Sequence, residues 1–150
     1  MLNLFEAVVM MAAKDIIHEP VRKALENDGW TITADPLTLK YEDKYVLTDL
    51  GAERVLIGAE RGLEKIAVEV KSFINRSVMQ DVEEALGQYL VYLTFLEKVD
   101  PERKLYIATS DLTYGVIAES KAIQMLLHKY QIPLLVVNPE RKEIVAWMQI

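Results

Sequence analysis

The clearest strand in this sequence is Lys65-Ile66-Ala67-Val68-Glu69-Val70-Lys71-Ser72-Phe73. Successive side chains of a strand point to opposite faces, so Ile66, Val68 and Val70 share one face. Glu69 and Lys71 share the other face, inside a stretch that is otherwise largely apolar. A charged group is unfavourable to bury unless it is paired or binds a metal. This stretch therefore predicts both a core strand and a polar site on it.

Helices and shorter strands are expected on both sides of this strand. Before it, helical spacing predicts a helix over residues 14 to 27, with a kink or restart at Pro20 and with Gly29 just past its end. After it, Ser77 and Gln80 match a capping box that opens a long helix through about Leu96. The other expected elements are strands at 30–33, 45–48, 54–57, 105–109, 133–137 and 143–148, and a helix at 113–129. This order predicts an α/β or α+β fold, in which helices pack on the faces of a sheet.

Composition limits the class of protein. The chain has 150 residues, of which 51% are hydrophobic and 27% charged, so one globular domain with a real core is expected over residues 1–150. It has no cysteine, which excludes disulfide scaffolds, thiol catalysis and Cys-based metal sites and suits a cytoplasmic location. Any metal must therefore bind oxygen or imidazole ligands. The net charge of −6 argues against a general binder of polyanions.

The N-terminal segment and the glycines exclude further classes. Residues 7–13 are apolar but far too short to span a membrane, and no basic residue precedes them, so neither a signal peptide nor membrane association is expected. A further Met at position 11 suggests that residues 1–10 are an N-terminal extension. The glycines Gly51, Gly58 and Gly62 fit neither the P-loop nor the dinucleotide-binding spacing, which leaves ATP and NAD unsupported.

Asp49, Glu69 and Lys71 are the residues that could carry chemistry. Asp49 ends an expected strand, and two carboxylates on adjacent strands can form an all-oxygen site for Mg²⁺ or Mn²⁺. An ammonium group beside a metal-bound water can position that water or stabilise charge developing on a phosphoryl group. The trio is thus complete for metal-assisted phosphodiester hydrolysis. Glu69 and Lys71 could instead be solvated residues on the outer face of an amphipathic strand.

Several stretches between Ala12 and Trp147 have a distinctive order of residues. They are Ala13-Lys14-Asp15-Ile16, Val21-Arg22-Lys23-Ala24-Leu25, Asp28-Gly29-Trp30-Thr31-Ile32-Thr33, Asp35-Pro36-Leu37, Asp49-Leu50-Gly51-Ala52-Glu53-Arg54, Ala67-Val68-Glu69-Val70-Lys71-Ser72-Phe73 and Glu83-Glu84-Ala85-Leu86-Gly87-Gln88-Tyr89. In these stretches the chain resembles the XisH family, the cyanobacterial fdxN-element excision controlling factors. The resemblance implies a restriction-endonuclease-like fold of the PD-(D/E)XK type, with a mixed central sheet flanked by helices. It also implies a part in programmed excision of a DNA element, together with a site-specific recombinase and a companion excision factor.

The resemblance assigns roles to the charged trio. The PD-(D/E)XK motif maps onto Asp49, Glu69 and Lys71, with Thr48 in the place of a proline that the superfamily can lose. Asp49 and Glu69 are then the metal ligands, and Lys71 supports the attacking water. Gln88 on the long helix is expected near the metal, as helix glutamines often are in nucleases of this type.

Other residues are assigned with an alternative beside each. Tyr92, four residues after Gln88, either belongs to the same pattern or is an ordinary aromatic at the edge of the core. Glu19 could be a further metal-shell carboxylate or a solvent-facing charge, and Asp15 is a weaker candidate for the same role. His18 and His128 have no nucleophile pattern nearby and are interpreted as structural.

The sequence does not decide which of two main functions the protein has. The first is a Mg²⁺-dependent endonuclease acting in excision, and the second is a noncatalytic regulatory protein that binds a recombinase or a companion factor. A housekeeping nuclease unrelated to excision is a third possibility. Because excision control does not by itself require cutting of DNA, the motif alone does not decide between them.

Contact with DNA is expected to be weak or to depend on delivery by a partner, because few basic residues lie near the expected site. These residues are Lys65, Lys71, Arg76, Arg22 and Lys23. The acid excess is local, since residues 77–102 hold six acids and one base, which marks the long helix as a surface for a protein partner. Aromatic residues on that helix are compatible with a homodimer or with a docked companion protein; they are Tyr89, Tyr92 and Phe95.

Overall fold

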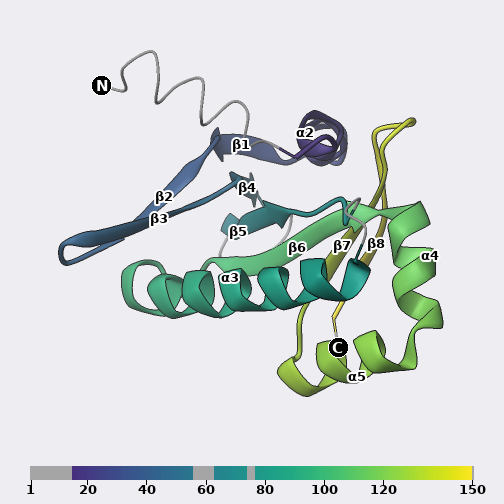
Figure 1. Cartoon of the computed structure of the whole chain (residues 1–150). Coiled ribbons are helices and arrows are strands. Elements are labelled where there is room, and N and C mark those ends of the chain that lie inside the picture. Colours follow the sequence, from purple (N-terminus) through teal and green to yellow (C-terminus); the bar gives the residue numbers. More distant parts are fainter. Residues whose placement is uncertain (1–14, 56–62, 74–76, 150) are drawn as a thin grey trace, which may run out of the picture.

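The computed structural model describes residues 15–55, 63–73 and 77–149, and in this part of the chain helices cover both faces of a central sheet (Figure 1). The sheet has six strands in the order β1-β4-β5-β6-β7-β8. Their bounds are β1 Thr31–Ala34, β4 Leu50–Val55, β5 Leu63–Val70, β6 Lys104–Ser110, β7 Leu134–Asn138 and β8 Glu143–Met148. The pairs β5–β6 and β6–β7 are parallel and the others antiparallel. The predicted mixed sheet flanked by helices is confirmed.

Strand β5 lies inside the sheet and is buried on both faces. Ile66, Val68 and Val70 pack into one core cluster and Ala67 into a second cluster on the opposite face. The alternation predicted from the sequence is therefore correct. Because helices cover both faces, the strand shows a nearly continuous apolar pattern rather than one apolar and one polar side.

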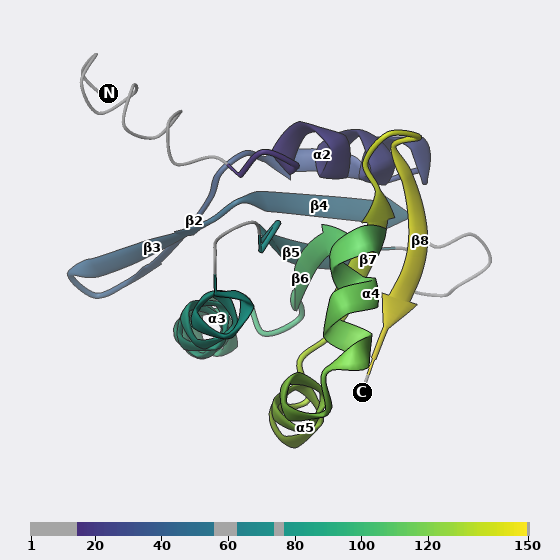
Figure 2. The same ribbon diagram turned by 45° about the vertical axis from the view of Figure 1, so that its right-hand side comes forward.

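The helices divide unequally between the two faces (Figure 2). Helix α2 (His18–Asn27) covers one face, where its buried residues pack with β5 and with Trp30. The other face carries α3 (Val78–Val99), α4 (Asp111–Glu119) and α5 (Lys121–Tyr130). Strand β5 thus lies between α2 and α3, so that a residue at its C-terminal end can meet side chains from both.

A separate hairpin projects from the sheet and creates two junctions. Strands β2 (Leu37–Tyr41) and β3 (Lys44–Thr48) pair only with each other in the described structure, and β2 packs against α3. The chain enters the hairpin from β1 through Asp35-Pro36 and leaves it for β4 through Asp49. Because β1 and β4 are neighbours, both junctions lie at the same place, where the hairpin separates from the sheet.

Helix boundaries differ from the expectation at two positions. Helix α2 begins at His18, so Pro20 lies in the first turn, where a missing N–H removes no intrahelical hydrogen bond and no kink is needed. The predicted end is correct, because Gly29 follows with φ +93°, which glycine adopts readily. The single helix expected over 113–129 is wrong: Ser120 has extended backbone angles and caps α5 by accepting a hydrogen bond from the N–H of Ile123.

The strands and the long helix agree better with the elements predicted from the sequence. Ser77 caps α3 through a 3.1 Å hydrogen bond from the N–H of Gln80, as predicted. Residues 54 and 55 of the strand expected at 54–57 form the end of β4, and residues 56 and 57 lie outside the described residues. Strand β2 was not predicted. The suggested extension at residues 1–10 also lies outside them. None of the helices in the described segments is long and apolar enough to cross a membrane.

Ile66 tests the burial of β5. We expect Ile66→Ala, at a position 1% exposed, to lower the free energy of unfolding by about 2–5 kcal/mol, because the substitution leaves a cavity between the sheet and α2. Ile16→Ala, at a position 73% exposed, is the matched control and should change it by less than about 0.5 kcal/mol. Urea denaturation followed by tryptophan fluorescence, from buried Trp30 and from Trp147 beside it, measures both. Equal effects would contradict the assignment of β5 to the core.

Candidate active site

Asp49, just before β4, and Glu69, in the neighbouring strand β5, lie at the same place in the sheet. Leu50 pairs with Val68, so the preceding residue Asp49 lies opposite the C-terminal end of β5. Asp49 Oδ2 accepts a 2.8 Å hydrogen bond from the backbone N–H of Val70, which fixes the carboxylate beside that strand end. The structure thus brings together the two predicted metal ligands, as the spacing of the motif requires.

Glu69 is a buried carboxyl group without a matched counter-charge. The residue is 8% exposed, and its Oε2 has no hydrogen-bond partner among the described residues. Burial, followed by repulsion from Asp49, raises the pKa of Glu69 from 4.5 to about 10, and the nearby charge of Lys71 only partly opposes this. Near neutral pH the ion-free site therefore holds Glu69 as a neutral acid. The alternative that Glu69 is a solvated charge on an outer face is wrong.

Lys71 follows the end of β5 at the rim of this site. Its backbone N–H donates a 2.9 Å hydrogen bond to the carbonyl of Ala108, so the chain still runs beside β6 here. Its Nζ lies 3.8 Å from Glu84 Oε1 on α3. The Lys71 side chain is largely buried whereas that of Glu84 is mostly exposed, so the ammonium group lies between the buried carboxyl of Glu69 and solvent.

One face of α3 is turned toward the site. Glu84, Gln88 and Tyr92 are spaced four residues apart and so lie along one side of the helix. Burial and then the negative charges of Glu69 and Asp49 raise the pKa of the Tyr92 hydroxyl, which places Tyr92 next to the carboxyl pair. Gln88 lies between Glu84 and Tyr92, and its Oε1 is buried without a hydrogen-bond partner in the described part of the chain.

His18 is buried near Asp49, although no pattern in the sequence singles it out for the site. Its Nε2 lies 2.9 Å from Asp35 Oδ1, and its Nδ1 lies 3.9 Å from Asp49 Oδ1. Asp35 in turn receives a hydrogen bond from the guanidinium of Arg22. The signal that could have found this group is positional: Asp35 and Asp49 occupy the two junctions of the hairpin, and His18 opens the helix that packs over them.

Asp15 ties the segment before α2 to the segment after β5. Its Oδ2 accepts a 2.8 Å hydrogen bond from the N–H of Ser72, and its Oδ1 accepts a 3.0 Å bond from the N–H of Ile17. Its charge also contributes to the raised pKa of Glu69. Asp15 therefore has a structural task at the edge of the site.

Glu19 occupies a different place from the one expected of a shared ligand. Its side chain is exposed, and its carboxylate gathers with His18 and Asp35, with ligand atoms within 4.8 Å of one another. Neither Asp49 nor Glu69 belongs to that group of three. The role of Glu19 as a metal ligand stays a prediction.

Most of the basic residues expected to contact DNA are engaged in ion pairs. Lys65 Nζ lies 2.7 Å from Asp100 Oδ1, and Arg22 pairs with Asp35 and Glu26. Lys23 is exposed, and Arg76 lies outside the described residues. The positive charge that is available for phosphates near the site is therefore small, as the sequence predicted.

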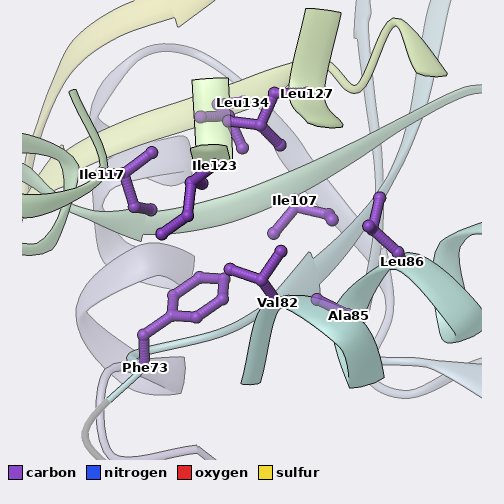
Figure 3. Close-up of a pocket in the computed structure, with 9 residues that line it drawn as sticks. All are labelled: Phe73, Val82, Ala85, Leu86, Ile107, Ile117, Ile123, Leu127 and Leu134. Carbon is purple, nitrogen blue, oxygen red and sulfur yellow. The ribbon is translucent and has the colours of Figure 1, made fainter. Parts of the chain in front are cut away.

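A small cavity of about 10 Å³ lies among α3, α4, α5 and the strands β6 and β7 (Figure 3). Phe73, Val82 and Ile107 are among its walls, and every side chain that lines it is apolar. A polar or charged ligand would have no partner there, so this cavity belongs to the core rather than to the site.

The donor set fits a divalent metal ion. Asp49 keeps one oxygen beyond its bond to Val70, and Glu69 has a buried oxygen without a partner in the described segments. Both are hard oxygen donors, the kind that Mg²⁺ and Mn²⁺ take. A divalent ion would also reverse the local electrostatics, because it supplies the positive charge that the buried pair lacks.

Glu69 should make the stability of the metal-free protein depend on pH. Folded Glu69 keeps its proton up to a pKa of about 10, whereas the unfolded chain loses it near 4.5, so folding takes up a proton between these values. The contribution of Glu69 to stability is therefore full below pH 4.5 and is lost as pH rises toward 10. Glu69→Gln removes this loss, because an amide does not ionise.

Urea denaturation in EDTA at pH 5, 7 and 9 measures this effect. The free energy of unfolding of Glu69→Gln relative to the wild type should increase with each step in pH. Glu143→Gln, at an exposed position of β8, is the control and should show a constant difference. A constant difference for Glu69→Gln as well would show that Glu69 is ionised in the folded protein.

Known proteins with a similar sequence or structure identify the family. The family model described as XisH protein matches residues 11–145. The crystal structure of an XisH family protein from Nostoc punctiforme PCC 73102 is 36% identical in sequence, with a TM-score of 0.79 over 89% of this chain and 99% of that one. The crystal structure of a fdxN element excision controlling factor protein from Anabaena variabilis is 37% identical, with a TM-score of 0.79 over 89% of this chain and 98% of that one. A search of curated proteins found no match.

These similarities agree with the fold seen here. The mixed sheet with helices on both faces is the restriction-endonuclease-like α+β arrangement that the sequence predicted, and both solved structures share it over nearly their whole length. The family model covers most of the chain, and both structures are more than a third identical to it. This chain therefore belongs to the XisH family.

Proposed function

We propose that this protein acts in the excision of a DNA element as a divalent-metal-dependent endonuclease. The observation that carries the proposal is the carboxyl pair: buried Glu69 lies beside the half-buried Asp49 at the end of a core strand, with an oxygen that has no partner among the described residues. Two carboxyl groups placed together, one of them buried, destabilise a protein unless they serve a ligand. The excision role rests on the Anabaena variabilis relative, whose description names it as an excision controlling factor.

Asp49 and Glu69 would hold Mg²⁺ or Mn²⁺. When bound, such an ion polarises a phosphodiester group and lowers the pKa of coordinated water. Asp49 is held for this task by the N–H of Val70, so its free oxygen has a fixed direction. Glu69 is held by the strand itself, since β5 is hydrogen-bonded to β4 on one side and β6 on the other.

Lys71 would orient the attacking water and stabilise the phosphoryl charge. In the reaction, a water oxygen would bond to phosphorus, the bond from phosphorus to the leaving sugar oxygen would break, the water proton would pass to solvent, and the leaving sugar oxygen would take up a proton from solvent. The ammonium group at the rim can donate hydrogen bonds to the water and to a non-bridging phosphate oxygen. Its exposed partner Glu84 lies 3.8 Å away, too far for a tight hydrogen bond, so the ammonium can turn toward a substrate. The carbonyl oxygen of Gln88, on the same side of α3, has no hydrogen-bond partner in the part of the chain that the structure describes, and it would position the water or the ion.

Delivery of DNA by a partner fits the distribution of charge. The ion pairs of Lys65 and Arg22 leave few cations for phosphates, and tight duplex binding requires several. We infer that a site-specific recombinase or a companion excision factor places the DNA. The acidic helix α3 offers one surface for such a partner, and its exposed Leu90 and Val91 offer apolar contact for the partner or for a second copy in a homodimer.

The same charge distribution favours a second candidate function. A protein with so little free positive charge near its carboxyl pair could act without cutting, as a regulatory subunit that binds the recombinase or the companion factor. In that case the metal would stabilise the fold rather than perform hydrolysis. Nuclease activity and metal binding therefore need separate tests.

Cleavage assays distinguish the two functions. We expect the wild type to cut duplex, nicked or branched DNA in Mg²⁺ or Mn²⁺, and Asp49→Asn or Lys71→Ala to lose at least about 100-fold in rate, because each removes charge stabilisation of the transition state. Asp43→Asn and Lys44→Ala, exposed at the tip of the hairpin, are matched controls that should keep the wild-type rate. Cleavage at the same rate by all five proteins would rule out this site. Absence of cleavage by the wild type on every substrate would support the regulatory function.

Thermal unfolding tests metal binding without DNA. A ligand that binds only the folded state raises the melting temperature, by about 2–4 °C per kcal/mol for a chain of this size. We expect Mg²⁺ and Mn²⁺ to raise the melting temperature of the wild type and of Asp43→Asn, but not that of Asp49→Asn. An equal rise in all three would place the ion elsewhere.

A further inference from the structure

The regular pairing of β5 with the sheet ends just before Lys71. Strand β5 ends at Val70, and its register with β6 ends at the pair formed by Val70 and Ala108. The backbone N–H of Lys71 donates one more hydrogen bond, to the carbonyl of Ala108. Strand β6 then ends at Ser110, which caps helix α4. The direction in which Lys71 leaves the sheet therefore depends on what holds the next residue, Ser72.

Side chains from two other segments hold the backbone of Ser72. Its N–H donates a 2.8 Å hydrogen bond to Asp15 Oδ2, in the segment before α2. Its carbonyl accepts a 3.0 Å hydrogen bond from Thr113 Oγ1, in the first turn of α4. Ser72 is buried, so both of its backbone polar groups need partners, and side chains supply them where the strand ladder has ended. We call these two hydrogen bonds the Ser72 clamp.

The Thr113 hydroxyl has a single orientation in this clamp. The carbonyl of Ser72 can only accept a hydrogen bond, so Thr113 must donate its one hydroxyl proton there. The hydroxyl of Ser110, 3.1 Å from that of Thr113, must then donate to it. Ser110 Oγ in turn accepts a 3.1 Å hydrogen bond from the N–H of Thr113. The cap of α4 and the clamp on Ser72 are thus one chain of hydrogen bonds.

The residue after the clamp is in an uncommon conformation. Phe73 has a φ of +54°, which residues with a side chain rarely adopt and keep only where their surroundings require it. Its ring lines the small apolar cavity, with Val82 of α3 opposite (Figure 3). The chain therefore turns sharply between Ser72 and this ring. The clamp fixes the peptide on one side of the turn, and the apolar packing fixes the other side.

We propose that Asp15 and Thr113 are positioning residues, which hold the ammonium group of Lys71 at the rim of the site through the backbone of Ser72. This inference rests on the proposed function, in which Lys71 acts on the attacking water. Neither positioning residue needs to touch the water, the ion or the DNA. Because the backbone on both sides of Lys71 is hydrogen-bonded, its side chain leaves the chain in one direction. Small misplacements of a reacting group are costly in rate.

Two substitutions of Thr113 separate positioning from the shape of the side chain. Thr113→Val has nearly the same shape without the hydroxyl, whereas Thr113→Ser keeps the hydroxyl. On the DNA substrate that the wild type cuts, Thr113→Val should lower kcat about tenfold and change KM by less than about twofold, because the substrate still binds but Lys71 is misdirected. Thr113→Ser should keep kcat within about twofold. Thr38→Val, exposed in β2, is the matched control and should keep the wild-type rate.

Nuclear magnetic resonance measures the place of Lys71 without any reaction. Lys71 Nζ lies 3.8 Å from Glu84 Oε1, so protons near the ends of these two side chains should show a nuclear Overhauser effect in the wild type. We expect the effect to persist in Thr113→Ser and to disappear in Thr113→Val and in Asp15→Asn, whose amide has one oxygen where two acceptors are needed. In the wild type, hydrogen exchange of the Ser72 amide should be slow. Exchange at the rate of an unprotected peptide would overturn the clamp even if no variant folds.

Each outcome decides between the claims. Equal kcat for Thr113→Val, Thr113→Ser and the wild type would overturn the positioning role and leave the proposed function standing. An equal fall in both variants would show that the threonine methyl group matters rather than the hydroxyl, and would also overturn it. If the wild type cuts no substrate, the proposed activity fails, and the Overhauser effect between Lys71 and Glu84 decides alone. Its persistence in Thr113→Val would then overturn this inference, and its loss there but not in Thr113→Ser would support it.

Discussion

Burial of the Glu69 carboxyl beside Asp49 is the constraint around which the site is arranged. A core strand would be more stable with an apolar residue at this position, and the protein instead keeps an acid whose pKa rises to about 10. Neighbouring elements contribute the other side chains of the site. The hairpin junction supplies Asp49, α3 supplies Tyr92 and Gln88, and α2 supplies His18. The fold thus holds several polar groups around Asp49 and a buried carboxyl group that, in the metal-free protein near neutral pH, keeps its proton.

The fold could be predicted from the sequence where the pattern is local. The alternation in β5 gave its two buried faces, and Ser77 with Gln80 gave the start of α3. The break at Ser120 could not be predicted, because residues 113–129 have a continuous helical pattern and the division depends on how α4 and α5 pack on the sheet. Strand β2 was not predicted, although apolar Leu37, Leu39 and Tyr41 alternate with polar Thr38 and Lys40, because five residues are a short segment for such a pattern.

The site was predicted only in part, for a related reason. Asp49, Glu69 and Lys71 follow from a linear motif on a strand and its neighbour, and the structure brings them to one strand end. His18 and Asp35 belong to no motif: they are 17 residues apart and meet only because α2 packs over the junction between β1 and the hairpin. Glu19 stays a prediction: its neighbour His18 is the residue that lies near Asp49, whereas Glu19 itself is exposed beside His18 and Asp35.

The hydrogen bond from Lys71 to Ala108 has a consequence for biosynthesis. The polar groups of the site lie between residues 15 and 92, yet the strand that holds Lys71 in place is β6, which the ribosome makes only after the whole of α3. During synthesis the N-terminal half of the chain carries its acids before β5 has a parallel partner. A nascent chain that ends within α3 cannot present the finished constellation, so any capacity to act on DNA arises late, after the strand that completes it has left the exit tunnel.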